Sequence, residues 1–106
     1  MLFNRGHLSI FEHFTLSVEY VTSRAIANEI VRHRIASYAQ CSTRYINHSD
    51  LEICLPQFPS FTQSQQEDLL VYFLQCENLY KSLISQNVPY EIARSILPNA
   101  TACHIV

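Results

Sequence analysis

The chain changes its hydrophobic period within one stretch, FTLSVEYVTSRAIANEIVRHR at residues 14–34. The apolar members of its first half are Phe14, Leu16, Val18 and Tyr20. They alternate with polar residues, which predicts a strand over residues 14–21 with one buried face. Thr22 or Ser23 then offers an N-cap, and apolar residues recur at helical spacing, so we expect a short helix over residues 23–34.

The elements on either side of this stretch are of mixed type. Residues 1–13 read as a loop, and residues 35–47 as a loop that leads into an extended segment. Further elements are predicted as a short strand at 51–55, helices at 63–86 and 89–97, and a last strand at 101–106. This order predicts one α+β domain over residues 1–106, with a mixed sheet packed against helices.

Composition excludes several classes of function. A net charge of -2 argues against a generic nucleic-acid binder, which usually carries a basic excess. No apolar run reaches the length of a membrane helix, and the N-terminus does not resemble a secretory signal. The four cysteines form no C-x-x-C pair, so we expect free thiols in the cytoplasm. The five histidines match no metal-ligand spacing, and no metal site is predicted.

Arginine is concentrated in one region. Four of the seven basic residues, Arg24, Arg32, Arg34 and Arg44, fall within 21 positions. The arginine fork suits bidentate contact with phosphate. If residues 40–45 are extended, Gln40, Ser42 and Arg44 share one face, opposite Cys41, Thr43 and Tyr45. That face suits a nucleotide, although composition alone favours a solvated loop with arginines that cap the end of a helix.

Three motifs in order resemble the flavin-dependent thymidylate synthases. The first is the segment GHLSIFEH at residues 6–13, and the second is Arg32-His33-Arg34 followed, after seven residues, by Ser42. The third is the downstream segment ARSILP, which includes Arg94 and Pro98. Together they cover nearly the whole chain, so the resemblance is far more specific than an isolated Arg-His-Arg.

The resemblance implies a reaction. The family makes thymidylate (dTMP) from deoxyuridylate (dUMP), with methylenetetrahydrofolate as one-carbon donor, flavin adenine dinucleotide (FAD) as cofactor and NADPH as reductant. Residues expected to contact FAD are His7, Ser9, Arg32, His33, Arg34 and Gln40. Residues expected to contact dUMP are Glu29, Arg32, Gln40, Ser42 and Arg44. No catalytic residue is assigned with assurance.

The chain departs from the family pattern in two ways. Gln40 stands where many members have glutamate, and Glu29 stands where many have glutamine. Family chains also run longer at both ends and build each site from several subunits of a homotetramer. The resemblance therefore implies an incomplete or weakly active core, and the single glycine in the chain also hints at a piece of something larger.

Other readings stay open. The chain is alternatively a non-catalytic oligomeric remnant that keeps the scaffold without cofactor, or, less favoured by its charge, a small RNA- or nucleotide-binding module. Cys41 is more readily a small buried hydrophobe than a nucleophile, and Ser42 has no evident base beside it. The apolar stripe on the 63–86 helix, with Tyr72, Phe73 and Tyr80, is core or a subunit contact.

Overall fold

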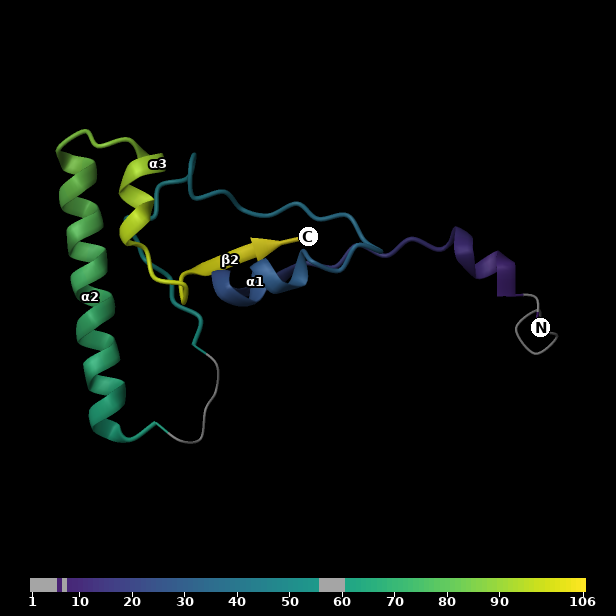
Figure 1. The fold of residues 1–106 in the computed structure, drawn as a ribbon, viewed down its shortest axis with the longest axis horizontal. Coiled ribbons are helices and arrows are strands. Elements are labelled where there is room, and N and C mark those ends of the chain that lie inside the picture. The colour runs from purple at the N-terminus through teal and green to yellow at the C-terminus, as the bar shows by residue number, and fades with distance from the viewer. Residues whose placement is uncertain (1–5, 7, 56–60) are drawn as a thin grey trace.

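A computed structural model describes Gly6, residues 8–55 and residues 61–106. Its helices and strands are η2 (Leu8–His13), β1 (Tyr20–Ser23), α1 (Arg24–Ile30), α2 (Gln63–Ser85), α3 (Tyr90–Ala93), η3 (Arg94–Ile96) and β2 (Ala102–Ile105). Here η denotes a 3₁₀-helix. The α+β class is confirmed: α1 packs on β1 and β2, while α2 packs on α3 and η3 (Figure 1).

β2 is the centre of the strand arrangement. It pairs antiparallel with β1 in the register Tyr20↔Ile105 to Ser23↔Ala102. On its other side two loop segments each add one bridge, Gln40↔Ile105 and Ile53↔Thr101. The core gathers around this arrangement and the inner face of α2: Ala27, Phe73, Cys76, Tyr80, Ala93, Ala102, Cys103 and Ile105.

The long helix predicted over 63–86 is confirmed as α2, with Phe73, Cys76 and Tyr80 as its buried residues. Thr62 caps its start in a capping box with Gln65. Its end is closed without glycine. Asn87 adopts a left-handed conformation (φ 60°), and the N–H groups of Asn87 and Val88 bond to the carbonyls of Ile84 and Leu83. This is the Schellman arrangement, with asparagine in the position that glycine usually takes.

Several predicted boundaries are wrong. The strand predicted over 14–21 begins only at Tyr20, because β2 offers pairing partners to Tyr20–Ser23 alone. Its alternating residues therefore lack a core to cover them, and Phe14 is 74% and Leu16 70% exposed. The segment predicted as strand 51–55 makes only the single bridge at Ile53. In the predicted loop 1–13, Leu8–His13 form η2; residues 1–5 and 7 lie outside the described part.

The two shorter helices also end early. For the helix predicted over 23–34, Ser23 is the N-cap of the two candidates Thr22 and Ser23, and the helix stops at Ile30. The N–H groups of Arg32 and His33 bond three residues back, to the carbonyls of Glu29 and Ile30, which tightens the last turn and ends the helix. The helix predicted over 89–97 divides into α3 and η3, with Pro89 at its N-cap.

The four cysteines are free thiols, as the sequence predicts. Among the described residues, no helix has both the length and the apolar character that a membrane crossing needs.

Candidate functional site

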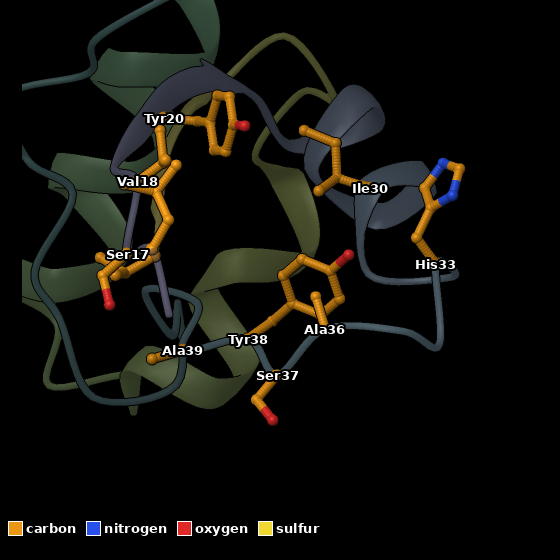
Figure 2. A pocket seen from close by; sticks show the side chains of 11 residues that line it. Ser17, Val18, Tyr20, Ile30, His33, Ala36, Ser37, Tyr38 and Ala39 are labelled. Atoms are coloured by element: carbon orange, nitrogen blue, oxygen red, sulfur yellow. The ribbon is translucent and has the colours of Figure 1, made fainter. Parts of the chain in front are cut away.

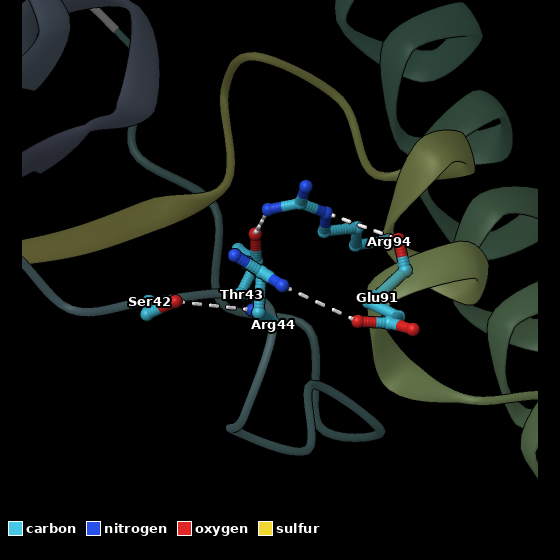
Figure 3. Close-up of polar contacts among 5 residues, drawn as sticks. All are labelled: Ser42, Thr43, Arg44, Glu91 and Arg94. Carbon is cyan, nitrogen blue, oxygen red and sulfur yellow. Dashed lines mark hydrogen bonds and ion pairs between the residues drawn. The ribbon is translucent and has the colours of Figure 1, made fainter.

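A polar cluster forms where the loop after Gln40 meets α3 and η3 (Figure 3). The Ser42 hydroxyl accepts a hydrogen bond from the Arg44 backbone N–H (3.2 Å), and the Tyr45 N–H points to the Ser42 carbonyl (3.5 Å). The segment is therefore extended only as far as Ser42 and then turns. The predicted alternation over 40–45 is wrong beyond Ser42, and the turn sends Arg44 toward α3.

Two arginines contact Glu91 in this cluster, Arg44 at its carboxylate and Arg94 at its backbone carbonyl. The Arg44 Nη2 lies 3.5 Å from the Glu91 Oε2, and its guanidinium lies 5.5 Å from the centre of the Tyr45 ring. Arg94 donates from Nε to the Glu91 carbonyl (3.1 Å) and from Nη1 to the Thr43 hydroxyl (3.5 Å). The cluster thus gathers two guanidinium groups and the hydroxyls of Ser42 and Thr43, which are groups that can bind an anion.

Arg94 was absent from the ligands expected from the sequence. Its position in the ARSILP motif was the sequence signal that could have identified Arg94 as a ligand. What the sequence alone does not give is the folding of η3 against the loop at Thr43, 51 residues away in the chain. That contact, together with the contacts that both arginines make with Glu91, places Arg94 in the same cluster as Arg44.

A separate groove of about 650 Å³ is lined in part by residues 36–39, at the start of the loop (Figure 2). Its lining is mostly apolar and comes from four segments: Leu16, Ser17, Val18, Tyr20, Ile30, His33, Ala36, Ser37, Tyr38, Ala39 and Val106. Tyr20 and Tyr38 add hydroxyl groups, and His33 lies at its margin. Its volume falls within the range of small-molecule pockets.

Arg32 and Arg34 are solvent-exposed after the end of α1. Arg32 pairs with Glu29 at 3.4 Å, with the two side chains 76% and 73% exposed, so the pair contributes little stability. Within the described chain, no hydrogen bond or ion pair joins Glu29, Arg32 or Arg34 to Ser42 or Arg44. The structure thus divides the predicted site residues into an Arg32–Arg34 group near the groove and a Ser42–Arg44 group at α3.

Ser9 is not brought to either group. Ser9 is exposed on η2, which projects away from α1 and β2 (Figure 1). His7 lies outside the described residues. Gln40 lies between the two groups, where it is half-buried and bridged to Ile105.

Two partly buried hydrogen bonds that the sequence did not reveal anchor the loop that carries Cys41 and His48. Arg24 donates from Nη2 to the Cys41 carbonyl (3.0 Å), and the His48 N–H donates to the Tyr80 hydroxyl (3.4 Å). Burial, and then the charge of Arg24, lower the pKa of His48 below its usual value. The buried Arg24 Nε and His48 Nε2 have no protein partner among the described residues. The two hydrogen bonds tie the loop to Arg24 at the start of α1 and to Tyr80 on α2.

Cys41 is part of this support. Its N–H and its carbonyl are both engaged, the first with the His104 carbonyl (2.9 Å) and the second with Arg24. Ser42 has no histidine or carboxylate hydrogen-bonded to its hydroxyl in the described part of the chain. The geometry accordingly favours binding and orientation of ligands over nucleophilic attack. No group of three or more His, Cys, Asp or Glu residues converges as metal ligands among the described residues.

Comparison with known proteins adds three findings. The family model described as "Thymidylate synthase complementing protein" matches residues 1–106. Flavin-dependent thymidylate synthases from Geobacter sulfurreducens and Pyrococcus furiosus are 37% and 38% identical over 105 and 107 residues, in each case 95% of this chain. The chain spans only 45% and 43% of those two proteins.

A solved structure has a similar fold. It is a UMP/dUMP methylase, PolB from Streptomyces cacaoi, bound with 5-Br dUMP. The TM-score is 0.75 at 20% sequence identity, over 98% of this chain and 53% of that one. At that identity the likeness supports the fold alone.

Proposed function

This chain belongs to the thymidylate synthase complementing protein family, and from that premise we propose that it supplies flavin- and nucleotide-binding parts of an enzyme that methylates dUMP. The overall reaction is the reductive methylation of dUMP to dTMP, with FAD as cofactor and with methylenetetrahydrofolate and NADPH as co-substrates. The observation that supports the proposal is the cluster that Arg44 and Arg94 form with Glu91 and Thr43, next to Ser42 in the chain.

The phosphate of dUMP fits this position by charge. A phosphate monoester carries about -1.5 to -2 charges at neutral pH and three strong acceptor oxygens. The Glu91 carboxylate carries one charge, and its pair with Arg44 is about half exposed (51% and 53%). Exposed pairs of this kind contribute about 0–1 kcal/mol, so a dianion can take the place of Glu91 at Arg44. Arg94 and the hydroxyls of Ser42 and Thr43 would supply further donors.

The groove lined by Tyr20, His33 and Tyr38 is the proposed flavin position. Its apolar walls suit a flat ring system, and His33 together with the exposed Arg32 and Arg34 offers donors and positive charge at its margin. Bound flavin supplies the redox chemistry, while this chain orients it and favours its electron-rich reduced form. Ser9 and His7 would join this position only if the N-terminal segment, or that of another copy, folds over it.

The chain spans under half the length of the relatives quoted above, so we propose that a complete site needs residues beyond those described. A homo-oligomer, a tetramer by family resemblance, is the proposed source of part of them. A removed arginine contact to a buried charge typically costs a few kcal/mol, so this chain alone is expected to turn over slowly or not at all.

Two observations favour the alternative of a non-catalytic remnant. Arg44 already has an internal counter-ion in Glu91, and η2, which carries Ser9, projects away from α1 and β2 (Figure 1). In that case the fold persists without cofactor, and neither FAD nor dUMP binds.

The deciding experiment is a flavin absorbance titration of the purified chain, first with FAD and then with dUMP. We expect a perturbed flavin spectrum that changes again when dUMP is added, and we expect the second change to vanish in Arg44→Ala. Lys81→Ala on the exposed side of α2 is the matched loss of one positive charge and should leave both changes intact. A folded chain that binds neither ligand would establish the remnant instead.

A further inference from the structure

Gln40 is the most firmly held of the predicted nucleotide ligands. Ala39 and Val106 exchange two backbone hydrogen bonds (2.8 and 2.9 Å), and the Cys41 N–H bonds to the His104 carbonyl (2.9 Å). These bonds bracket Gln40 on both sides and keep the segment extended through Cys41. Gln40 and Ser42 therefore share one face of the segment, and a ligand at Ser42 lies along the side of Gln40.

The side-chain amide of Gln40 is held as well. Its Nε2 lies 3.3 Å from the Cys103 Sγ and 3.5 Å from the Asn28 Oδ1. An amide nitrogen has two hydrogens, so these two contacts account for both. The Cys103 thiol can accept from Gln40 because its own hydrogen has carbonyl partners, His104 at 3.7 Å and Cys41 at 4.0 Å.

The amide oxygen of Gln40 is left available. Within the described chain no hydrogen bond reaches its Oε1. The reverse orientation would place Oε1 against the Asn28 Oδ1, two acceptors in contact, unless Asn28 also turned. Cys103 is 1% exposed and lies in β2, whereas Asn28 is exposed on α1. The two partners of the amide therefore come from two different elements.

We propose that Asn28 and Cys103 are positioning residues that fix the Gln40 amide with its oxygen outward, where it accepts a hydrogen bond from the nucleotide. The donor is a sugar hydroxyl or the N3–H of the uracil ring, the two donor types that dUMP offers. Gln40 then presents an acceptor-only face, as a carboxylate would, but without a negative charge near the phosphate. This inference rests on the proposed function, because it takes Gln40 to be a nucleotide ligand.

The test is the dUMP affinity of the FAD-loaded chain in matched variants. Asn28→Leu keeps the side-chain size and removes the acceptor, and we expect about a 2- to 10-fold loss of affinity, the worth of one hydrogen bond. Asn78→Leu makes the same change at an exposed position of α2 and should have no effect. Cys103→Ala should weaken binding similarly, and Cys103→Ser, which restores an acceptor, should recover it.

The Gln40→Glu background distinguishes positioning of the amide by Asn28 from a purely structural role of Asn28. A carboxylate has no N–H and no wrong orientation, so Asn28→Leu should cost less than about 2-fold there. Analogues identify the donor: the effect of Asn28→Leu should disappear with 2',3'-dideoxyuridine monophosphate if the sugar hydroxyl donates, or with N3-methyl-dUMP if the ring does.

The outcomes separate the two proposals. If the unmodified chain fails to bind dUMP, the proposed function falls and this inference falls with it. If the chain binds dUMP but Asn28→Leu behaves like Asn78→Leu, only the positioning role is overturned. An equal loss in the Gln40 and Gln40→Glu backgrounds also overturns it, since the effect would then not pass through the amide.

Discussion

Arg44 makes two contacts that differ in strength and in consequence. The cation–π contact with Tyr45 comes from the next residue in the chain and keeps the guanidinium close to the turn. The ion pair with Glu91 bridges the loop to α3, yet it is half exposed and easily exchanged. A residue held in place by a neighbouring ring and neutralised by a weak partner is ready for an anionic ligand.

We expect Arg94 to contribute to binding of the phosphate of dUMP and not to binding of its base. We expect Arg94→Met to weaken dUMP binding about 10- to 100-fold, because hydrogen bonds to a charged group contribute about 1.5–3 kcal/mol. Isothermal titration with dUMP checks this. Deoxyuridine, which lacks the phosphate, is the control ligand, and its affinity should be the same in both proteins. Equal losses for both ligands would show that Arg94 acts on the fold.

The lowered pKa of His48 predicts that the stability of the chain depends on pH. Its folded pKa is lowered from the usual value of 6.5, first by burial and then by Arg24. Below pH 6.5 the unfolded chain therefore binds a proton that the folded chain resists, and stability must fall as pH falls toward the folded pKa. Thermal unfolding at pH 7.5 and 5.5 should show a larger drop in Tm for the unmodified chain than for His48→Gln. Equal drops would mean that His48 does not contribute.

At the scale of elements, α2 is the part most strongly specified by local sequence. Its start is fixed by a reciprocal pair: the Thr62 hydroxyl accepts from the Gln65 N–H (3.3 Å), and the Gln65 side chain accepts from the Thr62 N–H (2.9 Å). Its end is fixed by Asn87 in a left-handed conformation. By contrast, α1 has only seven residues and relies on packing against β1 and β2.

Substitutions at the two ends of α2 should differ in their effect on the free energy of unfolding. Thr62→Ala removes the cap and should lower the free energy of unfolding by about 1 kcal/mol. Asn87→Gly should be neutral or slightly stabilising, because glycine adopts a positive φ without strain. Urea denaturation followed by circular dichroism measures both. A Thr62→Ala protein as stable as the unmodified chain would contradict the capping assignment.

At the scale of the whole molecule, the chain is far from compact. Its radius of gyration is 19.3 Å and its extents are 62 × 37 × 18 Å, whereas a globular domain of this length has a radius near 13 Å. The N-terminal segment extends away from the body (Figure 1), and Phe14 and Leu16 on it are exposed. α2 also exposes apolar residues, among them Leu70, Val71 and Leu74. Apolar surface on this scale is typical of an interface.

We therefore expect the chain to self-associate. Sedimentation equilibrium should give an average mass well above the 12.3 kDa of one chain and rising with concentration. The variant Phe14→Ser, which removes apolar surface from the N-terminal segment, should shift the population toward the monomer. Substituting Ser82 and Ser85 by alanine on exposed α2 positions serves as the control. A monomer at every concentration would remove the support for the homo-oligomer.

The sequence by itself determined whatever depends on neighbours in the chain. The helix at 63–86, the Ser23 cap, the final strand, the α+β class and the family motifs were all readable, because periodicity, capping and motif spacing are local properties. Tertiary structure decided what depends on distant partners. β2 limits β1 to four residues, the turn at Thr43 sends Arg44 to Glu91, and η3 brings Arg94 to the loop. Such contacts join residues from 47 positions apart (Arg44 and Glu91) to 85 positions apart (Tyr20 and Ile105). No local pattern encodes a pairing that forms only when the chain packs.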